Sequence, residues 1–208
     1  MIKQKSSWWS IRIALICMGV FVIQFIIGDL QNYFVLVSDY AVFRPWTIVT
    51  HAFMHGGFSH LLYNMFALLI FGPILEKVIG SKNFLILYAA AGLASAFISI
   101  PFYGAVLGAS GAIFGILGAL AILRPKMTVW VTGFPMPMAV AAAFWAFGDF
   151  IGLFVPSGTA NAAHLAGLFI GIGFGIYFYK KFKEVKHNRK NDIEISGESF
   201  DQWEKKWM

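Results

Sequence analysis

The stretch LGASGAIFG, residues 107–115, lies within a segment from Asn83 to Leu123 that contains no Asp, Glu, Lys or Arg. Glycines at helical spacing in so apolar a segment are typical of membrane helices that pack closely against a neighbour. Ser110 needs another explanation, because a polar group at membrane depth is costly unless it finds a partner or water. The stretch therefore predicts a membrane-embedded helix that begins with a polar group of functional interest.

The composition of the whole chain is that of a polytopic membrane protein. Of its 208 residues 59% are hydrophobic and only 12% are charged, and the mean hydropathy is +0.71. A helix needs roughly 20 apolar residues to cross the hydrocarbon core. Division of the apolar segments at Pro101 and at VPSGT (155–159) predicts an all-α bundle of six transmembrane helices. The expected spans are Ile11–Gly28, Phe58–Leu75, Asn83–Ile100, Gly108–Leu123, Met136–Val155 and Ala160–Tyr179.

Lysines and arginines gather on one side of this predicted topology. They precede the first span, lie between the second and third, and follow the fourth and sixth, and only Arg44 lies on the other side. By the positive-inside rule both termini are cytoplasmic, and the loop from Asp29 to Gly57 faces outside. The net charge of +6 predicts contact with anionic lipid rather than with nucleic acid.

We expect three parts along the chain. Residues 1–10 form a cytoplasmic N-terminal segment, residues 11–180 the six-helix domain, and residues 181–208 a charged cytoplasmic tail. In this tail Phe200, Trp203 and Trp207 fall at helical spacing, which leaves open a short amphipathic helix on the inner leaflet or a disordered tail. The charge pattern and the lack of a transit peptide predict a bacterial inner (plasma) membrane.

Polar side chains from three of the expected spans meet at one depth. His60 and Asn64 open the second span, Ser110 opens the fourth, and His164 opens the sixth. All three spans run from outside to inside, so these side chains lie a turn or two below the outer surface. Polar groups within the membrane are functional candidates by default.

Glycines predict which of these helices touch. Gly111, Gly115 and Gly118 share one face of the fourth span, and the sixth span has a matching face in line with His164. The glycines of that second face are Gly167, Gly171 and Gly175. Two such faces can pack with their backbones nearly in contact, which brings Ser110 beside His164. An imidazole there can take the hydroxyl proton during nucleophilic attack and return it to the leaving amine.

A serine nucleophile also needs hydrogen-bond donors for the oxyanion of its tetrahedral intermediate. At a helix start the backbone N–H of Ser110 has no intrahelical acceptor. His60 and Asn64, which lie on one helix face, add side-chain donors. Gly108 keeps the approach to the serine open and lets the backbone turn. These residues together predict a site for acyl transfer.

The sequence does not favour a metal-dependent site or a protease with two aspartates. In HAFMH (51–55), His51 and His55 have metal-like spacing, but no glutamate follows the first histidine as in an HExxH peptidase, so we expect no metal. Asp149 is the only carboxylate within an expected span, which excludes a protease with two aspartates. We interpret Asp149 as a hydrogen-bonded or water-facing structural group, with a role in tuning the site as the less favoured alternative.

Four ordered motifs resemble the rhomboid family of intramembrane serine proteases. They are HLLYNM (60–65), ILEKVIGS (74–81), GASGAIFG (108–115) and NAAHLAGLFIG (161–171). The resemblance covers essentially Arg44 to Gly175 and implies a six-helix rhomboid-like bundle. It also implies a catalytic dyad of Ser110 and His164 without a third acidic member, with the oxyanion residues named above. The fifth span and the loop from Leu153 to Ala160 are implied to act as a movable gate and cap.

The resemblance extends to residues that support the site or bind substrate, with two departures. The supporting positions are Gly108, Phe114 and Gly167. The family's first-loop Trp-Arg pair is Phe43-Arg44 here, with Trp46 nearby. Phe114 stands where many bacterial members have a tyrosine four residues after the serine. Its ring can stack on His164 but has no hydroxyl with which to hold the histidine.

The predicted function is hydrolysis of a peptide bond in or near the outer part of a substrate's transmembrane helix, through an acyl-enzyme. The expected partners are transmembrane protein substrates and the lipid bilayer, and no metal, nucleotide or other cofactor is expected. An alternative is a catalytically inactive relative that binds or escorts membrane helices, against which the presence of both Ser110 and His164 counts. A channel or transporter is less favoured, because paired broken helices are not evident.

Overall fold

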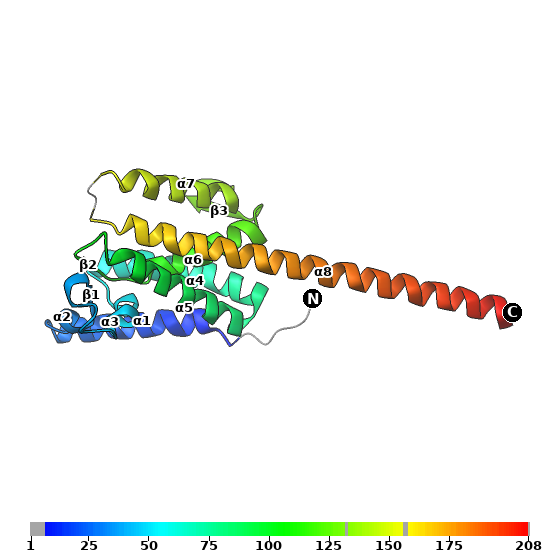
Figure 1. Ribbon diagram of the computed structural model, residues 1–208, viewed down its shortest axis with the longest axis horizontal. Helices are drawn as coiled ribbons and strands as arrows, with labels where there is room; N and C mark the ends of the chain where they lie inside the picture. The colour runs from blue at the N-terminus through cyan, green and yellow to red at the C-terminus, as the bar shows by residue number, and fades with distance from the viewer. Residues whose placement is uncertain (1–6, 132, 156–157, 208) are drawn as a thin grey trace.

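The computed structural model is a bundle of helices that lie along one long direction (Figure 1). It describes residues 7–131, 133–155 and 158–207, and residues 186–207 by their backbone alone. Helices α1 and α7 lie on opposite sides of the bundle, with the other long helices between them. The long helices of the described part are α1 (Trp9–Ile26), α4 (Phe58–Ile79), α5 (Ser81–Ser99), α6 (Ser110–Leu123), α7 (Met138–Gly152) and α8 (Asn161–Trp207).

Hydropathy and length mark the chain as a multi-pass membrane protein. Within the described residues, α1, α4, α5 and the part of α8 from Asn161 to Val185 are long and apolar enough to cross a membrane. Helices α6 and α7 are apolar but shorter. The 14 residues of α6 extend for about 21 Å, which is less than the hydrocarbon thickness of about 30 Å. Each expected span coincides with one long helix, and the count of six crossings stays a prediction.

The last helix continues beyond the expected end of the domain. Helix α8 runs from Asn161 to Trp207 without a break at residue 180, and its last part extends away from the bundle (Figure 1). The side chains of Phe200, Trp203 and Trp207 lie outside the described side chains. The amphipathic surface expected for the tail therefore stays a prediction, as does the three-part organisation.

Two small antiparallel sheets depart from the all-α expectation. β1 (Leu36–Val37) pairs with β2 (Ala105–Val106), and β3 (Thr128–Val131) pairs with β4 (Phe134–Pro137). Exposed and buried residues alternate along β3, as in a half-buried strand. The prolines of β4 lack an N–H and suit an edge strand. Hydropathy alone does not distinguish such short strands from parts of an apolar helix. The all-α prediction was therefore wrong for these two strand pairs.

The segment between α1 and α4 is irregular but tied together by polar contacts. Its short elements are α2 (Gln31–Phe34), η1 (Ser38–Tyr40), α3 (Thr47–Thr50) and η2 (His51–Phe53). Arg44 donates from Nη1 to the carbonyl of Asn32 at 2.8 Å, and Trp46 donates from Nε1 to the carbonyl of Tyr33 at 3.0 Å. The anchoring of this loop thus survives the replacement of the family's Trp-Arg pair by Phe43-Arg44.

Helix α6 is the centre of the bundle. Every residue from Gly111 to Leu120 except Phe114 is buried, and the helix packs against α4, α5, α7 and α8. The fully buried side chains Leu68, Phe84 and Ile116 come from α4, α5 and α6. The N-terminus of this short, enclosed helix therefore lies inside the protein rather than at its surface.

Glycines bring α6 and α8 into backbone contact. A Cβ added to Gly167 would overlap the carbonyl oxygen of Gly111, and one added to Gly171 would overlap the carbonyl oxygen of Gly115. A Cβ on Gly118 would overlap the carbonyl oxygen of Leu168 in the same way. We call this line of contacts the glycine seam. The close approach of α6 and α8 agrees with the predicted packing, but the glycine faces match only in part, because a Cβ added to Gly111 or Gly115 would overlap Ser95 or Ala91 of α5.

A buried carboxylate fastens α1 to the bundle. Glu76, near the end of α4, is fully buried and accepts hydrogen bonds from the backbone N–H groups of Trp9 and Ser10, each at 3.0 Å. The hydroxyls of Ser10 and Ser81 donate to the same carboxylate at 2.9 and 2.7 Å. A negative charge at a helix N-terminus is favourable. The motif ILEKVIGS (74–81) thus joins the ends of three helices, a role the sequence did not reveal.

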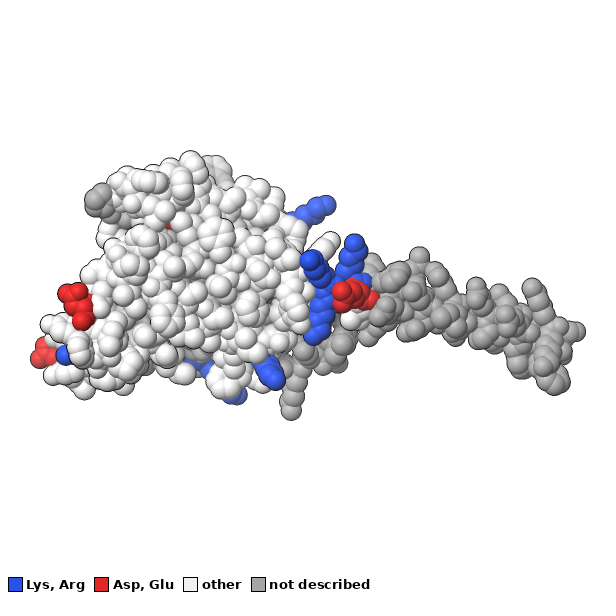
Figure 2. Space-filling model, viewed as in Figure 1, with Lys and Arg blue, Asp and Glu red and all other residues white. Residues whose placement is uncertain are grey.

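Charged side chains divide between the two ends of the bundle (Figure 2). Lys and Arg gather at the end from which α8 emerges, Asp side chains lie at the opposite end, and an uncharged surface separates them. The described basic residues of the first end are Arg12, Lys77, Lys82, Arg124, Lys126, Lys180, Lys181 and Lys183. This is the asymmetry on which the expected orientation depends, and the orientation itself stays a prediction.

The glycine seam predicts an unequal response of two glycines on α8. Gly171→Ala places a methyl group against the backbone of Gly115, and we expect a loss of about 1 to 3 kcal/mol in stability. Gly173→Ala is the matched control, because nothing lies within 4 Å of a Cβ at that position. Thermal unfolding in detergent micelles, followed by tryptophan fluorescence, measures the difference. Equal unfolding temperatures for the two variants would contradict the seam.

Candidate active site

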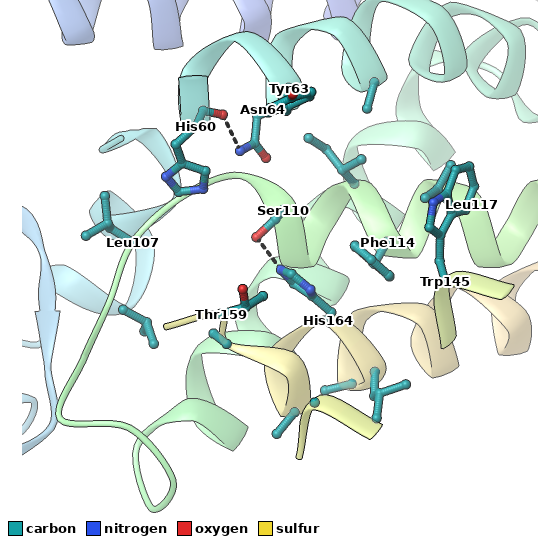
Figure 3. A pocket seen from close by; sticks show the side chains of 18 of the residues that line it. His60, Tyr63, Asn64, Leu107, Ser110, Phe114, Leu117, Trp145, Thr159 and His164 are labelled. Carbon is teal, nitrogen blue, oxygen red and sulfur yellow. Dashed lines mark hydrogen bonds between the residues drawn. The ribbon is translucent and has the colours of Figure 1, made fainter. Parts of the chain in front are cut away.

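Ser110 and His164 face each other at the end of the glycine seam where α6 and α8 begin (Figure 3). Ser110 is the first residue of α6, and His164 lies in the first turn of α8. The distance between Ser110 Oγ and His164 Nε2 is 2.9 Å, and both residues are half-buried. Gly111 directly follows the serine, and Gly167 lies about one turn after the histidine. The carbonyl oxygen of Gly111 leaves no room for a Cβ on Gly167. The close approach of two backbones therefore positions the pair.

The imidazole of His164 is contacted on its face and at both nitrogens. The ring of Phe114 stacks on it with a centroid distance of 4.3 Å and an interplanar angle of 8°, which confirms the expected stacking. Asp149 on α7 places Oδ1 3.1 Å from His164 Nδ1, and its side chain is 9% exposed. A carboxylate therefore stands beside the histidine, which departs from the resemblance-implied dyad without an acidic member. Its hydrogen bond agrees with the interpretation of Asp149 as a hydrogen-bonded group.

His60 and Asn64 lie across the cleft from the pair (Figure 3). Both line the same cavity as Ser110 and His164. Asn64 donates from Nδ2 to the carbonyl oxygen of His60 at 2.8 Å, which uses one of the two N–H groups of its amide. As the first residue of α6, Ser110 has a backbone N–H without an intrahelical acceptor. The predicted oxyanion donors are thus gathered at one place.

Gly108 lies in the turn directly before α6 and is buried. Its φ of +116° is one that other residues rarely adopt, and an added Cβ would lie 2.7 Å from Cε1 of His60. Its N–H donates to the carbonyl oxygen of His51 at 2.9 Å. The glycine therefore serves both the turn before Ser110 and the placement of the His60 ring.

A large apolar cleft of about 1890 Å³ extends from the serine between α4 and α7. Its lining on α4 includes Tyr63, Phe66 and Ile70, and its lining on α7 includes Trp145. The rings of Phe71 and Trp145 approach edge to face, with centroids 6.3 Å apart. Helix α7 packs mainly on α6 and α8 and meets α4 at this ring pair. The site is therefore open toward the side where α4 and α7 face each other.

Comparison with known proteins identifies the family. The family model described as "Rhomboid domain" matches residues 42–181, which is more than half of the chain. The chain belongs to the rhomboid family. "Rhomboid protein 1, mitochondrial" of Saccharomyces cerevisiae is 34% identical over 182 residues, which cover 82% of this chain and 51% of that protein. "Rhomboid protease GlpG" of Klebsiella pneumoniae is 28% identical over 200 residues, which cover 91% of this chain and 67% of that protein.

The rhomboid relatives support a protease that is embedded in a membrane. The chain spans about half the length of the yeast relative and about two thirds of that of GlpG. One relative is mitochondrial by name, so the expected bacterial inner membrane stays a prediction. The family assignment confirms the resemblance that the four motifs indicate.

In this rhomboid, polar contacts also fasten the end of α7 and the start of α8. Asn161 donates from Nδ2 to the carbonyl oxygen of Gly152 at 2.8 Å, and the N–H of Ala162 donates to the hydroxyl of Tyr103 at 2.8 Å. Neither contact was predicted, although Asn161 opens the fourth motif. The contact of Asp149 was easier to suspect from the sequence than these two, because Asp149 is the only acid in an expected span.

The two histidines of HAFMH hold the loop before α4. The N–H of His55 donates to Oε1 of Gln24 at 3.1 Å, and the Gln24 amide donates back to the carbonyl of His55 at 3.2 Å. Burial lowers the pKa of His55 to about 4, and the nearby His60 ring adds to this effect. Burial also lowers the pKa of His51, whose Nδ1 lies 2.9 Å from the carbonyl of Thr47. Among the described residues no three His, Cys, Asp or Glu side chains lie close enough to hold a metal.

The contact between Gly108 and His60 predicts the effect of one added methyl group. Gly108→Ala strains the backbone before Ser110 and displaces the His60 ring, so we expect proteolytic turnover to fall by about 10²-fold. Gly104→Ala, in the same loop, is the control, because an added Cβ there meets nothing within 4 Å. Cleavage of a model transmembrane substrate measures the effect. Equal turnover in both variants would show that the placement of the ring is unimportant.

Proposed function

We propose that this rhomboid is an active serine endopeptidase that cuts a peptide bond in or near the outer part of a substrate's transmembrane helix. The observation that carries the proposal is the 2.9 Å contact between Ser110 Oγ and His164 Nε2 at a helix start whose backbone N–H is unpaired within the helix. A serine, a base and an oxyanion donor within one site are the minimum for acyl transfer.

The proposed reaction proceeds through an acyl-enzyme. Ser110 Oγ attacks the scissile carbonyl carbon while its proton passes to His164 Nε2. The carbonyl oxygen becomes an oxyanion, which the Ser110 N–H, His60 and Asn64 stabilise. Collapse of this intermediate breaks the C–N bond, and His164 gives the proton to the leaving amine. Water then attacks the ester by the same steps in reverse, with His164 again taking and returning a proton.

The apolar cleft supports a transmembrane segment as substrate. Its walls on α4 and α7 carry large apolar side chains that remain exposed, such as Tyr63 and Phe66. A helical substrate hides its scissile carbonyl in the helix hydrogen bonds, so segments with helix-weakening residues are favoured. We also propose a preference for a small residue before the cut. Helix α7 and the loop after it form the gate in this proposal, with residues 156–157 outside the described part.

The proposed orientation places the site toward the outer face of the membrane. We propose that all six long helices cross or lie within the bilayer, with the basic end of the bundle in the cytoplasm. Both termini are then cytoplasmic, and Ser110, near the opposite end, lies below the outer surface. Water reaches the site from that surface, and the reaction as written needs no metal, nucleotide or other cofactor.

Covalent labelling tests whether the serine is activated. We expect a fluorescent fluorophosphonate to label the detergent-solubilised wild type, and we expect labelling to vanish in Ser110→Ala and in His164→Ala. Circular dichroism on each variant checks that the fold is intact. A different result would favour the alternative of an inactive relative that binds or escorts membrane helices. In that result the folded wild type is not labelled and does not cut a model transmembrane substrate.

The oxyanion role of Asn64 predicts a loss of turnover that another asparagine does not share. Asn64→Ala removes an amide that faces the serine, and we expect turnover to fall on the order of 10²-fold. Asn83 on α5 makes the same kind of contact, from Nδ2 to the carbonyl of Ile79 at 2.7 Å, but at the far end of the bundle. Asn83→Ala is therefore the matched control. Similar turnover in both variants would remove Asn64 from the oxyanion site.

A further inference from the structure

We propose that Asp149 is a positioning residue that fixes the tautomer of His164 and balances the charge that the ring gains during the reaction. The inference rests on the proposed function, because it assigns a third participant to the same site. Its basis is the 3.1 Å contact between Asp149 Oδ1 and His164 Nδ1, between side chains that are 9% and 12% exposed.

The contact determines which nitrogen carries the proton. In this proposal the Asp149 carboxylate is ionised and has no proton to donate, so His164 Nδ1 carries the hydrogen that lies between them. Nε2 is then the unprotonated nitrogen, and it is the one that faces Ser110 Oγ at 2.9 Å. This is the tautomer that a general base needs in order to accept the hydroxyl proton. Without the carboxylate, neither Ser110 nor Phe114 selects this tautomer, because a hydroxyl can donate or accept and an aromatic face does neither.

The carboxylate also lies where positive charge appears. When His164 takes the proton of Ser110, the ring becomes an imidazolium in a site that is half-buried beside an apolar cleft. A negative group in contact with Nδ1 stabilises that cation, and the effect is larger away from bulk water. Oδ2 of Asp149 is buried and has no hydrogen-bond partner among the described residues. The described side-chain hydrogen bond of this carboxylate is thus the one to His164.

The position of α7 determines whether this contact exists. Asp149 lies near the end of α7, and one turn later the carbonyl of Gly152 accepts a hydrogen bond from Asn161 on α8. The Asp149–His164 contact and the Asn161–Gly152 hydrogen bond therefore both join α7 to α8, about one helical turn apart. Asn161→Ala therefore loosens the same interface without removing the carboxylate, which makes it the matched control for a merely structural role.

Kinetics of Asp149→Asn and Asp149→Ala provide the first test. Asn keeps the size of the side chain and removes the charge, whereas Ala removes both. With a model transmembrane substrate we expect kcat to fall by about 10- to 100-fold in both variants while KM changes little. We expect Asn161→Ala to alter KM or the unfolding temperature instead. A wild-type kcat in both Asp149 variants, while the wild type is labelled by fluorophosphonate, would overturn this proposal and leave the proposed function intact.

The tautomer itself provides the second test, which needs no activity. The full-length protein in detergent is labelled with ¹⁵N-histidine, and the His164 signals are assigned by their loss in His164→Gln. We expect protonated Nδ1 and unprotonated Nε2 in the wild type and in Asn161→Ala, and a shift toward the opposite tautomer in Asp149→Ala. An unchanged tautomer in Asp149→Ala would overturn the proposal. An inactive wild type in which the tautomer still depends on Asp149 would refute the proposed function and support the positioning role.

Discussion

The direct contact of two helix backbones is the constraint on which the rest of the structure depends. Gly111 and Gly115 of α6 touch Gly167 and Gly171 of α8 with no room for a side chain between them. A larger residue at Gly167 or Gly171 would separate α6 from α8 and carry Ser110 away from His164, whereas one at Gly111 or Gly115 would collide with α5. The same seam places both residues at one level of the bundle, because each lies at the start of its helix. A hydrogen bond of 2.9 Å between two helices is thus a consequence of backbone packing rather than of flexible side chains.

Side-chain contacts around the seam hold it in place. Ser95 of α5 donates to the carbonyl of Ala163 at 2.7 Å, which ties α5 to the first turn of α8, and the hydroxyl of Tyr103 accepts from the N–H of Ala162, one of the N–H groups without an intrahelical acceptor at that helix start. Glu76 does the same for the start of α1. In a membrane an unpaired backbone group costs several kcal/mol, and here buried polar side chains meet that need. The bundle can therefore keep polar groups near its outer end without loss of order.

Much of the fold and the core of the site could be predicted from the sequence. Hydropathy located the long helices, and glycine spacing located the seam, because both are properties of residues near in sequence. Ser110 and His164 followed from that spacing together with their shared depth. The strands β3 and β4 were missed, because alternation over four residues is hidden within a longer apolar stretch.

The contacts of Asp149, Glu76 and Gln24 were beyond prediction for a different reason. Each joins residues far apart in the chain, and the rotation of a helix about its axis decides whether such side chains meet. Asp149 illustrates this, because the sequence shows one acid in an apolar helix but not the direction in which it points. The same residue could face a cavity or a neighbouring helix, and the packing of α7 on α8 places it against His164.

Helix α7 contributes both to the cleft beside the site and to the contacts of His164. This helix borders the apolar cleft on one side and carries the carboxylate that touches His164 on the other. It packs mainly on α6 and α8 and meets α4 at the Phe71–Trp145 ring pair, so the cleft lies on the α4 side of this helix. Because Asp149 is carried by α7, a displacement of α7 away from α8 would separate Asp149 from His164. In the proposed function the helix that admits the substrate is also the one that carries the carboxylate beside His164, and both contacts between α7 and α8 are formed in this structure.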